Sequence, residues 1–166
     1  MIIALESIFD NGISNIKLDY SFDFSTSEHN GAFPFTAPVT LKGCIKNETG
    51  IVYIDAVAGV DYDSSCDRCA CELHRHFDVP VSHVLVSTLN NEDNDDFILV
   101  EGMRLDVEQL TLEDIYLFLP TKLLCNEDCL GICPECGKNL NEGPCGCKKP
   151  VDPRFAALQQ LLQEQE

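Results

Sequence analysis

The chain has 166 residues, 28 acidic and 11 basic, which gives a formal net charge of −17 and an isoelectric point near 4.3. Such a chain lacks the broad Lys/Arg surface that non-specific binding to phosphate backbones requires. Its length and its 45% hydrophobic fraction suit one domain with a core plus a small appendage. The first residues show neither a basic segment nor an apolar run long enough for a signal or membrane span, so we expect a cytoplasmic protein.

The charge is unevenly distributed along the chain. Residues 122–154 hold five bases and five acids, residues 155–166 contribute −2, and residues 1–121 carry the remaining −15. We therefore predict an acidic, β-rich body over residues 1–121 and a near-neutral tail over residues 122–166.

Alternating apolar and polar residues over 16–24 predict a half-buried strand. Residues 39–46 and 51–60 predict a hairpin whose second strand is central, with Cys44 a free thiol on the polar face of the first. The acidic segments 61–67 and 90–96 are expected to be a turn and a loop. Residues 72–88 predict one strand or a strand pair, and residues 97–100 an edge or returning strand.

Two helices are predicted after these strands. Asp106 is a suitable N-cap for a helix over residues 106–119, with a buried face that includes Phe118 and an end at Pro120. Asp152 and Pro153 begin a final helix. The expected fold is α+β: an antiparallel, barrel-like or curved sheet with a packed helix, a C-terminal cysteine-rich zinc module and a final helix.

A tetrahedral metal site is predicted in the tail. Cys133 and Cys136 are separated by two residues and followed by Gly137, which favours a knuckle turn whose N–H groups face the thiolates. Cys145 and Cys147 supply two further thiols. These four residues are expected to hold Zn²⁺, with iron as the weaker alternative. A disulfide cluster is the competing interpretation, but it needs an oxidising compartment.

Four more cysteines have the spacing of a possible second site. Cys66 and Cys69 form one half, and Cys125 and Cys129 form the other. If the tail returns to the body, the four sulfur atoms should lie within about 4 Å of one another. The alternative is a reduced turn at Cys66 and Cys69, with Cys125 or Cys129 a spare ligand for the first ion.

The histidines do not suggest catalysis. His74, His76 and His83 are interpreted as exposed strand residues because no third ligand is close in the sequence. No His-Glu-x-x-His or His-x-Glu element is present, and an all-thiolate site leaves no open position, so we expect no enzyme activity.

Three segments resemble the YceD-like family, whose members act in accumulation of the large-subunit ribosomal RNA. They are Cys66-Asp-Arg-Cys69, Leu117-Phe-Leu-Pro120, and the run from Cys129 to Asn141 together with Cys145-Gly-Cys147 and Asp152-Pro-Arg154. The resemblance covers about residues 40–162. It implies a non-enzymatic, cytoplasmic role in large-subunit ribosome biogenesis. Other members lack most of the tail cysteines, so zinc is not a universal part of that role.

The resemblance implies a partner in the assembling large subunit: either precursor ribosomal RNA or a ribosomal protein. An RNA contact in so acidic a chain would need a local basic patch. The candidate residues are Lys138, Lys148, Lys149 and Arg154. The alternatives are that these bases only solubilise the surface, and that the protein is an acidic chaperone for one basic ribosomal protein, with a purely structural zinc site.

Overall fold

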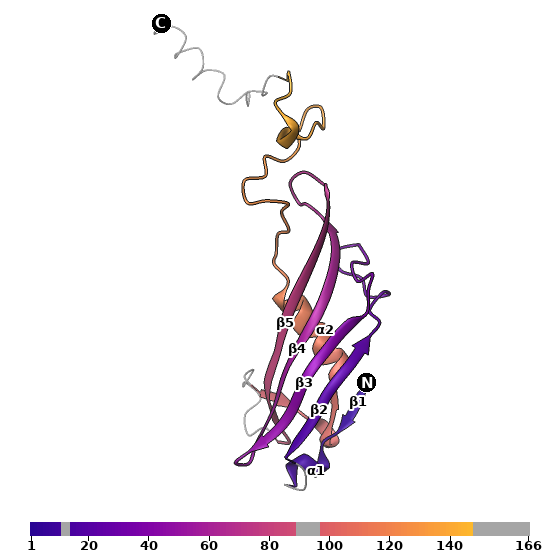
Figure 1. Cartoon of the computed structure of the whole chain (residues 1–166), viewed down its shortest axis with the longest axis vertical. Coiled ribbons are helices and arrows are strands. Elements are labelled where there is room, and N and C mark those ends of the chain that lie inside the picture. Colours follow the sequence, from indigo (N-terminus) through magenta and orange to yellow (C-terminus); the bar gives the residue numbers. More distant parts are fainter. Residues whose placement is uncertain (11–13, 89–96, 148–166) are drawn as a thin grey trace, which may run out of the picture.

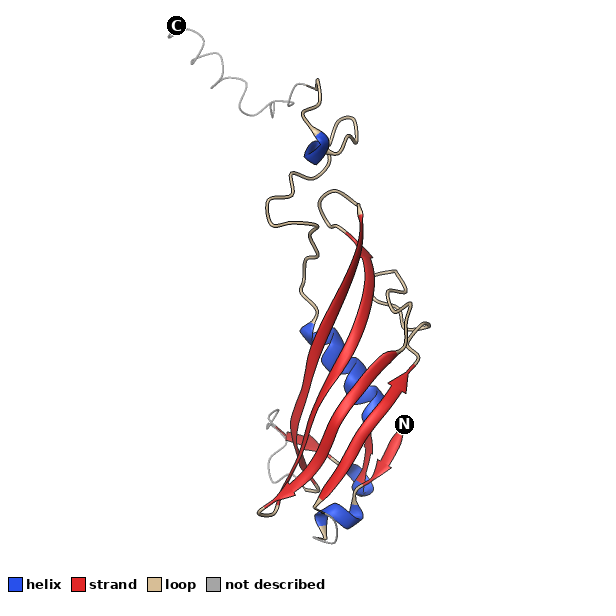
Figure 2. Ribbon diagram, in the orientation of Figure 1, coloured by secondary structure: helices blue, strands red, loops and turns tan. Residues whose placement is uncertain are grey.

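The computed structural model describes residues 1–10, 14–88 and 97–147. The fold is α+β, as predicted. A long twisted sheet packs against one helix, and the tail extends beyond one end of the sheet (Figures 1 and 2). We keep the names body for residues 1–121 and tail for residues 122–166. The predicted final helix, the 90–96 loop, Lys148, Lys149 and Arg154 lie outside the described residues.

The main sheet has the strand order β2-β3-β4-β5-β6. The pairs from β2 to β5 are antiparallel, and β6 is parallel to β5. The bounds are β2 Asn15–Phe22, β3 Val39–Glu48, β4 Ile51–Ser65, β5 Glu72–Val86 and β6 Phe97–Leu99. Since β2 and β6 are the two edges and do not pair with each other, the sheet is open, and the barrel-like alternative is wrong.

The β4–β5 hairpin is longer than predicted. Residues 61–65 continue β4 instead of turning, and 72–86 form one strand. The acidic residues fit a strand because Asp61 and Asp63 point to solvent opposite His76 and His74, while Tyr62 between them is buried. The turn of the hairpin is therefore formed by residues 66–71. Cys66, Cys69 and Cys71 in this turn lie beyond the end of the other strands.

Helix α2, Val107–Phe118, begins as predicted at the N-cap Asp106, whose carboxylate accepts the N–H groups of Glu108 and Gln109. It lies against one face of the sheet (Figure 2). Oδ2 of Asp114 on α2 lies 2.8 Å from Nε2 of His83 on β5, so His83 is a half-buried contact between helix and sheet. The prediction that Phe118 is buried is wrong: the helix ends there, Leu119 takes the core position, and Phe118 stays 46% exposed.

A second, two-stranded sheet was not predicted. Strand β1, Ile2–Ala4, pairs antiparallel with β7, Arg104–Asp106, just before α2. The short helix α1, Glu6–Phe9, follows β1, and Leu5 and Ile8 are fully buried in the core. Short 3₁₀ turns occur at Glu101–Met103 and, in the tail, at Leu140–Glu142.

One hydrophobic core fills the space between the sheet and α2. Its sheet residues alternate with exposed ones, as the period of two requires. A smaller cluster beyond the end of this core consists of Cys66, Cys69, Leu73 and Cys129, with Leu123 and Leu124 packed against it. This second cluster is where the tail meets the body.

Candidate metal centres

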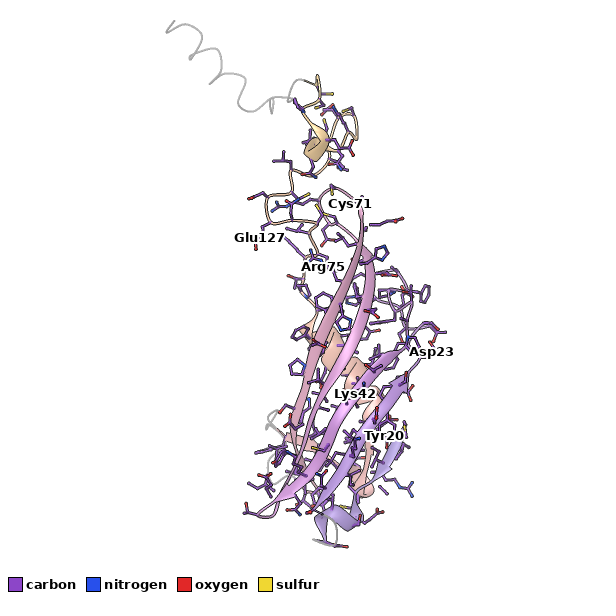
Figure 3. All side chains as sticks on the ribbon, in the orientation of Figure 1. Tyr20, Asp23, Lys42, Cys71, Arg75 and Glu127 are labelled. Carbon is purple, nitrogen blue, oxygen red and sulfur yellow. The ribbon has the colours of Figure 1, made fainter. Side chains whose placement is uncertain are left out.

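The turn between β4 and β5 presents thiols at the tip of the hairpin. The N–H of Cys66 donates to the carbonyl of Cys71 at 2.8 Å, and the N–H of Ala70 donates to the carbonyl of Cys66 at 2.8 Å. These bonds fold the turn so that Cys66 and Cys69 are buried, with 2% and 7% exposure. Cys71 lies at the same tip, facing the tail (Figure 3).

The tail returns to this tip through polar contacts of its first residues. The N–H of Asp67 donates to the carbonyl of Leu123 at 2.8 Å, and the N–H of Leu123 donates to the Asp67 carboxylate at 2.6 Å. Arg75 of β5 reaches the carbonyl of Leu124 at 2.7 Å, beside the tail as Figure 3 shows. The body therefore fixes the chain just before Cys125.

A second set of contacts fixes the chain around Cys129. The guanidinium of Arg68 donates to the carbonyl of Cys129 at 2.9 Å, and the carbonyl of Arg68 accepts the N–H of Ile132 at 3.1 Å. Gly131 has φ +76, and a Cβ there would lie 2.9 Å from the Arg68 oxygen. The close approach therefore requires glycine.

Five sulfur atoms meet between the body and the tail; we call them the body–tail cluster. The Sγ atoms of Cys66, Cys69, Cys71 and Cys125 all lie within 4.8 Å of one another. Cys129 Sγ is 3.8 Å from Cys66 Sγ, and Cys125 Sγ is 3.7 Å from Cys69 Sγ. Two pairs of the predicted second site, Cys66–Cys129 and Cys69–Cys125, therefore lie within the predicted distance of about 4 Å, and Cys71 lies beside them.

The four tail cysteines of the predicted first site also converge; we call them the knuckle cluster. Cys133, Cys136, Cys145 and Cys147 have Sγ atoms within 4.8 Å of one another. The N–H of Gly137 donates to the carbonyl of Cys133 at 2.8 Å, and the N–H of Cys133 donates to the carbonyl of Lys138 at 2.8 Å. These two bonds make the predicted turn, in which Gly137 has φ +73.

The thiols in each cluster differ in how readily they ionise. Burial disfavours the Cys66 thiolate, but N–H groups directed at its sulfur outweigh burial and lower its pKa to about 6. The hydrogen bond with Cys129 raises the pKa of Cys125 to about 11. Backbone N–H groups lower the pKa of Cys133 to about 7, whereas a hydrogen bond to a neighbouring thiol raises that of Cys147 to about 12. Adjacent thiolates repel one another, and a bound cation removes that repulsion.

Each cluster can bind a metal ion. All ten cysteines lie in the described ranges, and none of them forms a disulfide. Closely grouped thiolates are the donors that soft or borderline cations such as Zn²⁺ prefer. Among the described residues, no other group of three or more His, Cys, Asp and Glu side chains has the geometry of a metal site.

The other candidate residues occupy less distinctive places. His74 and His76 pair with Asp63 and Asp61, each at 2.6 Å, on the exposed face of the sheet. Within the predicted basic patch only Lys138 is described, and its ammonium donates to the carbonyl of Pro144 at 3.1 Å. In the part of the chain that the structure describes, no helix is long and apolar enough to cross a membrane.

Two residues of the site were missed in the sequence. Cys71 follows Cys69 with one residue between them, a Cys-x-Cys spacing that resembles the Cys145–Cys147 pair and is therefore a usable signal. Asn141 donates its side-chain N–H to Cys129 Sγ at 3.3 Å and accepts the N–H of Leu130 at 2.8 Å. No sequence pattern indicates that contact, because Asn141 is brought to Cys129 by the knuckle turn.

The chain is thus an α+β protein with an open sheet and two cysteine clusters beyond one end of it, each of which could hold a metal ion. The model of the family described as large ribosomal RNA subunit accumulation protein YceD matches residues 55–162, more than half of the chain. The chain therefore belongs to the YceD family. The matched region includes most of β4, all of β5 and α2, and both clusters.

Several known proteins are similar to this chain at 26–29% sequence identity. An uncharacterized protein of Mycobacterium leprae is 26% identical over 131 residues, which cover 76% of this chain and 60% of the relative. An uncharacterized protein of Mycobacterium tuberculosis is 29% identical over 101 residues, 58% of this chain and 49% of its own length. This chain thus spans half to three fifths of these relatives.

The uncharacterized protein YlbN of Bacillus subtilis is 26% identical over 135 residues, which cover 78% of this chain and 77% of that protein. No solved structure matches the chain. The family description connects the chain with ribosome biogenesis in general terms.

Proposed function

We propose that the protein supports accumulation of large-subunit ribosomal RNA in the cytoplasm by binding a component of the assembling large subunit, without catalysing a reaction. The observation that carries the proposal is the family match over residues 55–162. The matched range contains the hairpin tip and the tail turns, so both cysteine clusters lie within it.

The metal in this proposal is zinc, and its role is structural. Four thiolates close the tetrahedral coordination of Zn²⁺ and leave no position for water or substrate. The knuckle cluster offers Cys133, Cys136, Cys145 and Cys147 within 15 residues of chain, with backbone N–H groups directed at the Cys133 thiolate. Zinc there would hold the knuckle in one shape for recognition by a partner.

The surface charge favours a basic partner over naked RNA. Residues 1–121 carry a formal charge of −15, and Lys138, the one described residue of the predicted basic patch, is already hydrogen-bonded to the carbonyl of Pro144. An acidic surface attracts a lysine- and arginine-rich ribosomal protein and repels phosphate. We therefore favour a basic ribosomal protein as the partner. The acidic-chaperone alternative, in which the chain shields one such protein, is compatible with this choice. Precursor ribosomal RNA is the competing candidate.

Depletion of the protein tests the biological role. Large-subunit ribosomal RNA should fall relative to small-subunit RNA, measured on total RNA from matched cultures, and re-expression of the wild-type chain should restore the ratio. Equal loss of both RNAs, or no loss, would remove the ribosomal role.

The partner is tested separately with purified full-length, zinc-loaded protein. Its binding to individual large-subunit ribosomal proteins and to precursor RNA is compared over a range of salt concentrations. A preference for a basic protein supports the favoured partner. Tight RNA binding that weakens steeply with salt, and is lost with Lys138→Glu, would support the RNA candidate instead.

A further inference from the structure

The body–tail cluster joins parts of the chain that are far apart in sequence. The two close sulfur pairs, Cys69 with Cys125 and Cys66 with Cys129, link residues that are 56 and 63 positions apart. The knuckle cluster, by contrast, is formed within the tail. A metal ion in the body–tail cluster would therefore connect two regions of the protein, which is a role beyond the binding of a ribosomal component.

Two sets of four thiols are available. One is Cys66, Cys69, Cys71 and Cys125, whose Sγ atoms all lie within 4.8 Å of one another, and the other has Cys129 in place of Cys71. Zinc–sulfur bonds of about 2.3 Å in a tetrahedron place neighbouring sulfurs about 3.8 Å apart. The pair Cys69–Cys125 at 3.7 Å, common to both sets, matches this separation, and so does the pair Cys66–Cys129 at 3.8 Å, which only the set with Cys129 contains. The pair Cys69–Cys71 at 3.4 Å is shorter and fits a thiol hydrogen bond beside the metal.

Burial and neighbouring donors favour the same set. Cys129 is 3% exposed, whereas Cys71 is only partly buried. The N–H of Cys125 points at Cys66 Sγ at 3.3 Å, and the side chain of Asn141 donates to Cys129 Sγ at 3.3 Å. Hydrogen bonds to ligand sulfurs orient them and stabilise their thiolate form.

Within residues 122–147, the described part of the tail, little else attaches the chain to the hairpin tip. The apolar contact there is limited to the buried Leu73 and the partly buried Leu123 and Leu124. Leu130 and Ile132, next in the tail, point outward with 68% and 47% exposure. The remaining attachments are a few hydrogen bonds, each worth about 1 kcal/mol in water.

We propose that the body–tail cluster is a second zinc site, with Cys66, Cys69, Cys125 and Cys129 as ligands and Cys71 as a neighbouring thiol outside the coordination shell. The bound ion attaches the tail to the tip of the β4–β5 hairpin. Because Asn141 of the knuckle turn donates to Cys129, the ion also fixes the position of the knuckle cluster relative to the body.

Zinc content of the full-length protein, measured by native mass spectrometry after reconstitution with Zn²⁺ alone, tests the ligand set. A spare thiol could replace a lost ligand, so the comparison is made in a Cys71→Ser background. Cys71→Ser should bind as much zinc as the wild type, and Cys71→Ser/Cys129→Ser should bind one equivalent less. Cys71→Ser/Cys44→Ser is the matched control and should lose none, because Cys44 lies on β3 away from both clusters.

Two results would overturn the ligand set: loss of one equivalent in Cys71→Ser, or no loss in Cys71→Ser/Cys129→Ser. The attachment of the tail is read from hydrogen exchange of the Leu123 and Ile132 amides, which donate to Asp67 and Arg68. They should exchange at least tenfold faster in Cys71→Ser/Cys129→Ser than in Cys71→Ser. Equal exchange would show that zinc does not hold the tail. Ribosomal RNA levels play no part in this test, so it can fail independently of the proposed function.

Discussion

Replacing Gly131 by alanine should weaken the attachment of the tail to the hairpin tip. The left-handed conformation at φ +76 costs a non-glycine residue about 1 kcal/mol or more. The new Cβ would lie 2.9 Å from the carbonyl oxygen of Arg68, so the two segments must separate. That movement breaks the hydrogen bond from the Ile132 N–H to the same oxygen, which is worth about 1 kcal/mol. The total of about 2–3 kcal/mol corresponds to roughly a 30- to 150-fold shift toward the detached tail.

Gly137→Ala is the matched control for this experiment. Gly137 has nearly the same φ, +73, but an added Cβ would meet no atom within 4 Å. Both variants therefore carry the backbone cost, and only Gly131→Ala carries the clash with Arg68. Hydrogen exchange of the Ile132 amide, measured on zinc-loaded full-length protein, should accelerate in Gly131→Ala and change by less than about tenfold in Gly137→Ala. Equal acceleration in the two variants would refute the close approach of Gly131 to Arg68.

Three further predictions concern the body and the metal. A double-mutant cycle on His83 and Asp114, read from urea denaturation, should give a coupling of about 1–3 kcal/mol; a value near zero would show that the pair does not join α2 to the sheet. The hydrogen bond to Asp63 raises the pKa of His74. The contribution of this pair to stability is therefore complete below the usual histidine pKa of about 6.5, and it is lost as the pH rises through the raised pKa. Asp63→Asn should therefore flatten the decline of the denaturation midpoint above about pH 6.5, and an unchanged decline would exclude the pair as its source. Removing metal with a chelator should accelerate exchange of tail amides and leave the circular dichroism of the sheet unchanged; loss of the sheet signal would mean that the body also depends on metal.

Much of the fold could be predicted because its signals are local. The alternation in β2 and β3 and the N-cap at Asp106 depend only on neighbouring residues, and the structure has these elements close to the predicted bounds. The spacing around Cys133 and Cys136 similarly indicates a knuckle turn. By contrast, the acidic composition of residues 61–65 suggested a turn, whereas cross-strand partners such as His74 and His76 make it a strand. That information lies more than ten residues away in the sequence.

The rest depended on long-range contacts. Strand β1 is only three residues long, and its partner β7 is about a hundred residues away, so no local pattern predicts it. The exposure of Phe118 follows from where α2 ends relative to the core, which helical spacing does not specify. Cys71 was overlooked although its Cys-x-Cys spacing was a usable signal, because the tail cysteines that it lies beside are far away in the sequence.

The pairing of β1 with β7 also matters while the chain is being synthesised. Residues 2–4 pair with residues 104–106, so β1 has no strand partner until about a hundred more residues have been synthesised. At translation speeds of about 5–20 residues per second, β1 would remain without β7 for roughly 5 to 20 seconds. The cysteines of the tail emerge later still. Strand β1 is thus paired only shortly before the tail is made, and until then its apolar residues are left for other molecules to shield.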